Sequence, residues 1–406
     1  MRTEKITFTN SDNQDLSGRL ELPVDRKPHA YAIFAHCFTC SKNIKAAVQI
    51  SRALACQGIA VLRFDFTGIG ASEGEFAETS FSSNVDDLVR AAEFMRREEM
   101  PPALLIGHSL GGAAVINAAG KIDSIRAIIT IAAPSDPAHI IDHFKENEEE
   151  ILQRGEAEVD LGGRTFRIRK EFIDDLRESH LEEALQNLKK PLLVMHSPFD
   201  KIVSIDHAAT IFKAARHPKS FISLDTADHL LSNAQDADYA GLIAATWAGK
   251  FLEIRRKDPD VTHPDNKVVA RLEQGFHTDI VANGHPLVAD EPIAVGGTNH
   301  GPSPYDLLVA GVGACTAMTL RMYADHKKLP LDAVTVTLTH KKIHAKDCDD
   351  CSSETGKIDH IEREISLTGE LDAEQQQRML EIADRCPVHK TLHSEVKITS
   401  RLVEEE

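Results

Sequence analysis

Leu104-Leu105-Ile106-Gly107-His108-Ser109-Leu110-Gly111-Gly112 is the stretch that decides the fold of the N-terminal half of this chain. Its apolar start predicts a buried strand, and the alanine-rich residues 113–119 that follow predict a helix. Gly-x-Ser-x-Gly between a strand and a helix is typical of a sharp turn, where bulk two residues to either side of the serine would clash. We therefore expect Ser109 to be exposed at a sheet edge, beside N–H groups at a helix start that suit a developing oxyanion.

Composition limits the possible functions of the chain. Its length of 406 residues predicts two or three domains, and its net charge of -17 argues against nucleic acid or an anionic membrane as a partner. The first residues contain no apolar core of a signal peptide, and no stretch is expected to span a membrane. The seven cysteines are therefore interpreted as free thiols of a cytoplasmic protein and not as a disulfide framework.

Apolar strands and helical patterns alternate through the first half of the chain. A hairpin is expected within residues 4–24, and buried strands at 31–35, 59–65, 104–106, 127–132, 191–196 and 220–224. Alternation of this kind predicts an α/β fold, with a doubly wound and mostly parallel sheet covered on both faces. Residues 136–190 break the pattern and predict a cap over Ser109, with a solvated surface excursion as the alternative.

Two residues that follow later strands complete a catalytic constellation with Ser109. Asp200 follows the strand at 191–196 and His229 follows the last strand, so both are expected at the edge that carries Ser109. Serine, acid and histidine in this chain order are typical of one class of hydrolase. A serine hydroxyl becomes a good nucleophile when an imidazole takes its proton, and a carboxylate orients that imidazole.

Other residues compete for the acid and base roles. Asp206 is the second candidate acid, and Asp225 and Asp228 are weaker because neighbours in sequence rarely orient a histidine. His196 and His207 are weaker candidate bases because neither follows the final strand.

Residues 1 to about 255 resemble the esterase-like branch of the α/β-hydrolase superfamily through these motifs. The resemblance implies that the backbone N–H groups of Phe38 and Leu110 form the oxyanion hole. Phe38 ends His36-Cys37-Phe38, where the family often has His-Gly-Phe, so Cys37 departs from the usual glycine. The glycine-rich residues 65–74 resemble the loop after the fourth strand of this family, and no cofactor is expected.

The second half of the chain begins after a charged, proline-containing segment. Residues 256–266 are interpreted as the linker between domains 1–255 and 267–406. Beyond it, strands are expected at 268–272, 276–281, 286–289, 334–344, 360–368 and 396–399, and helices at 304–326 and 372–385. Strands and helices are segregated here, which predicts an α+β domain.

Two cysteine-containing segments give this half its chemistry. Gly301-Pro302-Ser303-Pro304 leads into a helix with Ala314-Cys315, and Cys386-Pro387-Val388-His389 follows the last helix. Together they resemble the OsmC/Ohr family over about residues 267–406. The resemblance implies an intertwined homodimer that reduces organic hydroperoxides, in which one cysteine becomes a sulfenic acid and a second forms a disulfide with it, to be reduced by a dithiol.

The resemblance makes Cys315 the peroxidatic and Cys386 the resolving cysteine. A thiolate in an apolar helix requires a nearby cation, which the family supplies as an arginine held by a glutamate ten positions before the cysteine. Tyr305 occupies that position here, so the neighbouring Asp306 is the candidate carboxylate and Arg271 the candidate cation. The alternative is that both cysteines are ordinary buried small residues.

Two Cys-x-x-Cys pairs, Cys37/Cys40 and Cys348/Cys351, raise the question of a metal site. Neither has a matching pair at a spacing typical of zinc, so no metal is expected. A solvated loop is favoured at Cys348/Cys351 over a labile disulfide or an opportunistic metal. Cys37/Cys40 is not expected to act as a thioredoxin-type pair, because its segment serves the oxyanion hole.

The sequence thus predicts a serine esterase that acts on a small-molecule ester. A second hypothesis makes thiol-dependent reduction of an organic hydroperoxide the main activity. A third gives the OsmC-like half only the roles of forming the homodimer and shaping the pocket.

Overall fold

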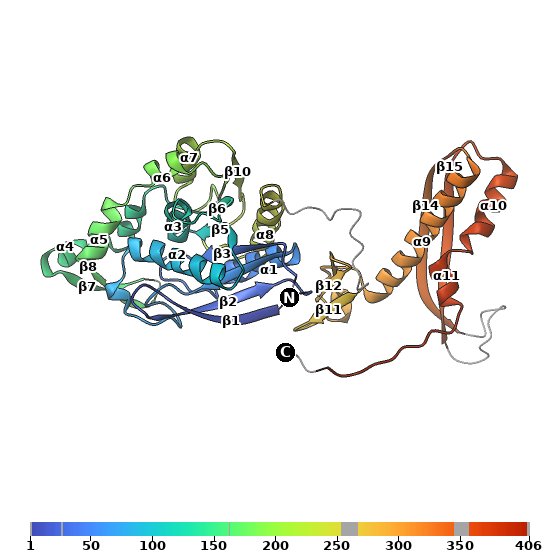
Figure 1. The fold of residues 1–406 in the computed structure, drawn as a ribbon, viewed down its shortest axis with the longest axis horizontal. Helices are drawn as coiled ribbons and strands as arrows, with labels where there is room; N and C mark the ends of the chain where they lie inside the picture. Colours follow the sequence, from blue (N-terminus) through green and yellow to red (C-terminus); the bar gives the residue numbers. More distant parts are fainter. Residues whose placement is uncertain (1, 26, 162, 253–266, 345–356, 404–406) are drawn as a thin grey trace. The chain divides into compact units, whose positions relative to one another are not determined.

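The computed structural model describes residues 2–25, 27–161, 163–252, 267–344 and 357–403 (Figure 1). Contacts divide the chain into two compact units. The first unit comprises Met1–Arg271 and Asp279–Leu287, and the second comprises Leu272–Thr278 and Val288–Glu406. The predicted linker 256–266 and the pair Cys348/Cys351 lie outside the described residues, so the predicted domain bounds stay a prediction.

An eight-stranded sheet forms the centre of the first unit, in the order β1-β2-β4-β3-β5-β6-β9-β10. Its strands are β1 (Arg2–Thr9), β2 (Asp15–Leu22), β3 (Ala30–Ala35), β4 (Ile59–Phe64), β5 (Pro102–His108), β6 (Ala127–Ile131), β9 (Leu192–His196) and β10 (Lys219–Ser223). β2 pairs antiparallel with both β1 and β4, and the other neighbours are parallel. This confirms the predicted doubly wound, mostly parallel sheet.

Helices cover both faces of this sheet, because side chains that alternate along each strand enter two separate cores. Ile33 and Phe34 are neighbours on β3, yet each belongs to a different core. One core is closed by α1 (Lys45–Cys56) and α8 (Ala234–Gly249), and the other by α2 (Phe81–Arg97), α3 (Leu110–Ala119) and α7 (Ile205–Ala214) (Figure 1). A single turn of 3-10 helix, η1 (Phe76–Glu78), precedes α2.

The insertion predicted at 136–190 lies between β6 and β9. It consists of η2 (Pro137–Phe144), α4 (Lys145–Arg154), the hairpin β7 (Glu156–Asp160) and β8 (Thr165–Arg169), α5 (Lys170–Glu178) and α6 (Leu181–Asn187). This insertion contacts the loop of residues 36–43, which follows β3. The ring of Phe172 stacks on that of Phe38 at 5.6 Å, and the Arg164 guanidinium donates a hydrogen bond to the Thr39 carbonyl.

The second unit is built on one long helix and a long strand pair. α9 (Pro304–Lys327) packs on β14 (Leu331–His344), which pairs antiparallel with β15 (Lys357–Gly369), and α10 (Ala373–Ala383) and α11 (Pro387–Leu392) follow. Its core joins Leu320 of α9 to Met379 of α10. Preceding α9 in the chain are the three-stranded sheet of β11 (Val268–Leu272), β12 (Thr278–Ala282) and β13 (His285–Ala289), and η3 (Ile293–Val295).

Two expectations for this half need correction. Residues 396–399, predicted as a strand, have no regular structure, and Ile398 is 85% exposed; within the described part of the chain, no strand pairs with them. By length and composition α9 could cross a membrane, contrary to the expectation that no stretch could, since its mean hydropathy over 18 residues is 1.4. Apolar core helices of soluble proteins can have the same length and composition.

Candidate active site

Ser109 occupies a strained turn between β5 and α3, as its motif predicts. Its φ of 55° and ψ of -125° lie in a region of backbone conformation that residues other than glycine rarely adopt. The turn leaves no room beside it: a Cβ on Gly107 would lie 2.2 Å from the Gly111 carbonyl oxygen, and one on Gly111 would lie 2.5 Å from the Ala35 carbonyl oxygen. These two glycines therefore permit the close approach of β5, α3 and β3 that presents Ser109.

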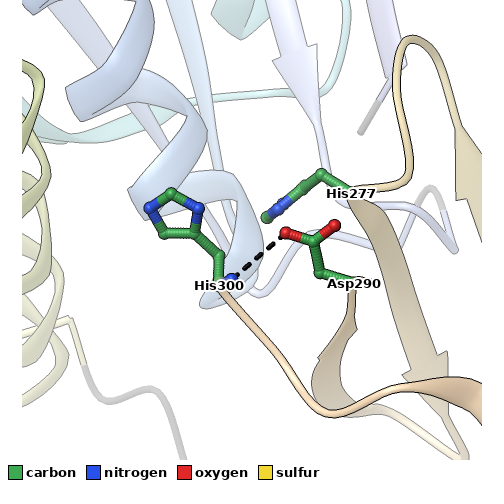
Figure 2. A group of neighbouring side chains, drawn as sticks. All are labelled: His277, Asp290 and His300. Atoms are coloured by element: carbon green, nitrogen blue, oxygen red, sulfur yellow. Dashed lines mark hydrogen bonds between the residues drawn. The ribbon is translucent and has the colours of Figure 1, made fainter. Parts of the chain in front are cut away.

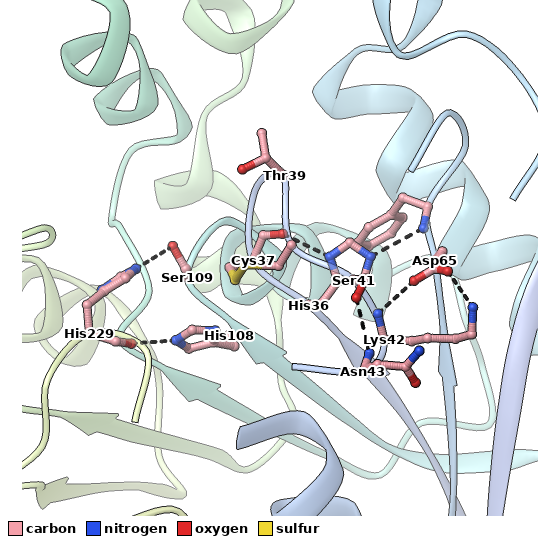
Figure 3. The surroundings of a disulfide bond; sticks show 12 residues. His36, Cys37, Thr39, Ser41, Lys42, Asn43, Asp65, His108, Ser109 and His229 are labelled. Atoms are coloured by element: carbon pink, nitrogen blue, oxygen red, sulfur yellow. Dashed lines mark hydrogen bonds and ion pairs between the residues drawn. A yellow bond between two sulfur atoms is a disulfide. The ribbon is translucent and has the colours of Figure 1, made fainter. Parts of the chain in front are cut away.

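The structure brings Ser109, His229 and Asp200 together. His229 Nε2 lies 3.0 Å from Ser109 Oγ (Figure 3). On the other side of the ring, His229 Nδ1 lies 2.8 Å from Asp200 Oδ2. Each of the three follows a strand of the sheet, namely β5, β9 or β10, so all lie at its carboxyl edge. They are buried, with exposures of 5% for Ser109, 9% for Asp200 and 8% for His229.

Asp200 is held as a carboxylate. Its Oδ1 accepts hydrogen bonds from the N–H groups of Ile202 (2.8 Å) and Val203 (3.0 Å), while Oδ2 accepts the one from His229. Burial alone would raise the pKa of Asp200, but these hydrogen bonds outweigh it and the pKa is lowered. An ionised Asp200 requires that His229 Nδ1 carries the proton, which leaves Nε2 to accept the proton of Ser109.

The structure gives the competing residues other partners. Asp206 accepts a hydrogen bond from the Ser204 hydroxyl at the start of α7, and His196 Nε2 hydrogen-bonds to the Val203 carbonyl at 2.8 Å. His207 Nδ1 bonds to Ser135. Asp225 accepts a hydrogen bond from Ser223, and Asp228 accepts one from the Ser232 N–H.

His108 is a part of this site that the sequence analysis did not single out. Its Nε2 lies 2.7 Å from the backbone carbonyl of His229. Burial lowers the pKa of His108 to about 3, so the ring is neutral and donates Nε2–H to that carbonyl. His108 therefore ties the loop that carries His229 to the end of β5. The sequence could have pointed to His108 through its position in the Gly-x-Ser-x-Gly motif, directly before Ser109.

The loop of residues 36–43, which we call the oxyanion loop, contains a disulfide between Cys37 and Cys40 (Figure 3). This corrects the interpretation of all seven cysteines as free thiols. A Cα–Cα distance of 5.3 Å is suited to a disulfide, and a tight turn with Thr39 at a φ of 58° provides it. Phe38, whose N–H is the predicted oxyanion donor, lies inside the ring that the disulfide closes.

Buried charges anchor the far end of the oxyanion loop. Asp65 accepts hydrogen bonds from the Lys42 N–H at 2.7 Å and from the Lys42 ammonium, and the Arg63 guanidinium donates to the Lys42 carbonyl. Lys42, Arg63 and Asp65 are each at most 4% exposed. Breaking such a buried pair is costly, so these residues hold the loop in one conformation.

An apolar pocket lies next to the oxyanion loop. Its apolar lining comprises Phe38, Phe66, Ile69, Phe76, Leu110 and Ala114. The insertion adds further aromatic side chains, since Phe166 lies edge-on to Phe76 at 4.8 Å. The predicted donor residues Phe38 and Leu110 thus line a pocket whose walls suit an apolar group.

In the second unit, the structure brings Cys315 and Cys386 together, as the motif pair implied. The two thiols hydrogen-bond to each other. Burial and this bond raise the pKa of Cys315. For Cys386, hydrogen bonds from Cys315 and from backbone N–H groups of α11 outweigh burial and lower the pKa. These shifts run in opposite directions, although the resemblance makes Cys315 the peroxidatic cysteine.

The cation near this pair is Arg363, which sequence analysis missed. Its guanidinium donates to the Thr316 hydroxyl at 3.2 Å and to Asp384 at 2.6 Å, the residues beside and just before the two cysteines. Asp306 has another role than the one predicted: it forms a capping box with Ser303. Nine residues of helix separate Asp306 from Cys315, about 13 Å along the axis.

Arg271, the predicted cation, belongs by its contacts to the first unit, and Cys315 belongs to the second. The role assigned to Arg271 therefore stays a prediction. Position 363 lies on β15, far from both motifs in sequence, and only the fold could place it near the cysteines.

Both halves of the chain are similar to known protein families. Residues 26–155 match the family described as serine aminopeptidase, S33, and residues 297–401 match the family described as OsmC-like protein. The crystal structure of the esterase domain of a Rhodothermus marinus protein is 50% identical, with a TM-score of 0.52; the match covers 62% of this chain and 100% of that domain. The chain belongs to the α/β-hydrolase family. The C-terminal part of this α/β hydrolase is an OsmC-like domain.

Less similar proteins agree with this assignment of the hydrolase domain. Mitochondrial palmitoyl-protein thioesterase ABHD10 of Rattus norvegicus is 28% identical over 171 residues, which are 41% of this chain and 52% of that protein. The chain thus spans about half the length of this curated relative. The structure of mouse alpha/beta hydrolase domain-containing protein 10 is 21% identical with a TM-score of 0.52, covers 61% of this chain and 99% of that one, and shares the fold.

Proposed function

We propose that this α/β hydrolase is a serine esterase whose nucleophile is Ser109. The observation that carries the proposal is the continuous hydrogen-bonded chain from Ser109 through His229 to Asp200, at 3.0 and 2.8 Å. The apolar pocket beside it and the 50% identity to an esterase domain support the same reaction.

The geometry suits acyl transfer in two steps. Ser109 Oγ attacks the ester carbonyl as His229 Nε2 takes its proton, and the N–H groups of Phe38 and Leu110 stabilise the negative charge on the carbonyl oxygen. His229 then passes the proton to the departing alcohol. Water attacks the acyl-enzyme in the second step, with His229 again as the base, and releases the acid. Asp200 stabilises the charged imidazole throughout.

The acyl group is proposed to be small or medium-sized and apolar, because the pocket is narrow and aromatic. The rat relative is named a palmitoyl-protein thioesterase, so thioesters belong among the substrates to be tested. We expect the purified full-length chain to hydrolyse nitrophenyl esters of graded acyl length, with an optimum below the longest chains. No turnover of any ester or thioester in the series would contradict the proposal.

Reduction of the Cys37–Cys40 disulfide is expected to lower kcat for ester hydrolysis several-fold. Loss of one oxyanion donor costs about 10²- to 10³-fold, and a loosened Phe38 N–H loses part of that. The measurement compares kcat before and after treatment with a dithiol, in a Cys315→Ser/Cys386→Ser background, with thiol counting to verify reduction. A Cys37→Ser/Cys40→Ser variant should start at the lowered value and not respond; an unchanged kcat after verified reduction would rule out a role for the disulfide.

A second candidate function, thiol-dependent reduction of an organic hydroperoxide, is favoured by the contact between Cys315 and Cys386. A thiolate attacks the peroxide O–O bond, becomes a sulfenic acid and releases an alcohol once the alkoxide gains a proton. The other thiol attacks that sulfur, water departs and a disulfide forms, which a dithiol reduces. We propose Cys315 as the attacking sulfur, because Cys386 is completely buried.

Cys315→Ser is expected to abolish peroxide consumption, and Cys386→Ser to stop it after a single turnover with a trappable sulfenic acid on Cys315. Cys56→Ser is the matched control, because Cys56 is the other free cysteine among the described residues and burial raises its pKa to about 12. Peroxide assays with a dithiol reductant provide the measurement. Full activity in Cys315→Ser would refute this assignment, and a sulfenic acid trapped on Cys386 would reverse the roles.

We further propose that the protein forms a homodimer through the OsmC-like domain. Large apolar side chains are exposed on its helices, among them Met318 at 66%, Met322 at 72% and Leu380 at 50%. Exposed apolar surface of this extent is typical of an interface. Light scattering of the purified chain should give twice the mass of one chain, and a monomer at micromolar concentration would contradict this.

A further inference from the structure

Three side chains of the second unit, His277, Asp290 and His300, form a cluster that neither proposed reaction uses (Figure 2). His277 immediately precedes β12, Asp290 follows β13, and His300 lies in the segment before α9. One nitrogen of each imidazole and one carboxylate oxygen of Asp290 lie within 4.8 Å of one another. The irregular spacing hid this cluster from sequence analysis, which expected no metal site.

Asp290 is the buried member of the cluster and is held as an anion. It is 1% exposed, and its Oδ2 accepts hydrogen bonds from the Thr298 hydroxyl and from the N–H groups of Thr298 and His300, both at 3.1 Å. These bonds, that of the Thr298 hydroxyl above all, hold the pKa of Asp290 far below its usual range. The carboxyl group of Asp290 thus lies beside the two imidazoles and is oriented by these hydrogen bonds.

Thr298 lies between Asp290 and His300. Its hydroxyl donates to Asp290 Oδ2, and His300 Nδ1 lies 2.6 Å from the same hydroxyl oxygen. In Figure 2, Nδ1 is the ring nitrogen of His300 that is turned toward His277 and Asp290, whereas Nε2 points away from them. A metal ion held by this cluster would therefore bind His300 through Nδ1, in place of its contact with Thr298.

We propose that His277, Asp290 and His300 bind a divalent transition-metal ion. Two imidazoles and one carboxylate suit zinc, cobalt or ferrous iron, and three protein ligands leave a coordination position open for water or a small ligand. Metal–ligand bonds of about 2.0–2.2 Å place ligand atoms roughly 3.4 Å apart, so small side-chain rotations would close the cluster around the ion. The alternative is that Asp290 only orders residues 297–300 and that the histidines lie near it without a function.

The test is titration of the metal-stripped full-length chain with Co²⁺, followed by displacement with Zn²⁺. We expect a Co²⁺ site with d–d absorption in the visible and no thiolate-to-cobalt charge-transfer band in the near ultraviolet. This absorption should persist in a Cys315→Ser/Cys386→Ser variant. His277→Gln and His300→Gln should each weaken its binding at least tenfold. His326→Gln, an exposed histidine at the end of α9, is the matched control and should change nothing.

Two results would overturn the proposal. One is that Co²⁺ does not bind, or binds only at a site whose spectrum contains a thiolate-to-cobalt charge-transfer band. The other is binding that His277→Gln and His300→Gln leave unchanged. Since His300 is exposed, its variant should fold normally, and circular dichroism identical to that of the original chain verifies this. Both readouts are independent of ester and peroxide turnover, so they test the metal proposal separately from the proposed functions.

Discussion

Replacement of Ser109 by alanine is expected to lower kcat for ester hydrolysis by about 10⁴- to 10⁶-fold, because the reaction loses its nucleophile. The residual rate should be that of an oxyanion hole acting on bound substrate and water. Steady-state hydrolysis of a nitrophenyl ester measures the effect. KM should change little, since the hydroxyl contributes little to binding of the ground state.

Two control variants make the Ser109→Ala result specific. Ser124→Ala removes another serine hydroxyl, one that donates to the Pro102 carbonyl at the start of β5 and so lies at the opposite edge of the sheet. It should retain full ester turnover. Cys315→Ser should also retain it, because the thiols take no part in acyl transfer. Ester turnover in Ser109→Ala within tenfold of the original would exclude Ser109 as the nucleophile.

Asp200→Asn should lower kcat by about 10⁴-fold while leaving the fold intact. With the amide oxygen in the place of Oδ1, the NH2 group faces His229 Nδ1 and donates to it. This favours the tautomer in which His229 Nε2 carries the proton and cannot act as a base. Two N–H groups that bond to Oδ1, those of Ile202 and Val203, can still bond to the amide oxygen. The loss should therefore appear in kcat and not in thermal stability.

Asp206→Asn is the matched control, since Asp206 was the second candidate acid in the sequence. Its carboxylate bonds to Ser204 at the start of α7, so the variant should keep ester turnover and lose only a small amount of stability. A large loss in Asp206→Asn together with a small one in Asp200→Asn would exchange their roles.

The hydrolase fold could be predicted because each of its signals is local. An apolar run that ends in Gly107-His108-Ser109 specifies a strand, a turn and a helix within a few residues, and acid and histidine each follow a strand directly. Parallel strands bring their carboxyl ends to one edge, so chain order alone predicted that Ser109, Asp200 and His229 would meet.

The sequence could not predict features that join distant segments or depend on the turn geometry of a few residues. Pairing of Cys37 with Cys40 requires the left-handed backbone at Thr39, and composition pointed to free thiols. Arg363 reaches the cysteine pair only because β15 packs near α9, which no motif encodes. The cluster of His277, Asp290 and His300 likewise unites three loops. For Val396–Thr399, a strand-like alternation was present, but none of the described strands pairs with these residues.

The central claim, that Ser109 is an activated nucleophile, is tested most directly by labelling the full-length chain with a fluorophosphonate and locating the adduct by mass spectrometry. The account predicts one adduct per chain, on the peptide that contains Ser109, forming at least a hundredfold more slowly in Asp200→Asn. An adduct on another residue, or ester turnover that continues in a protein fully labelled elsewhere, would contradict it.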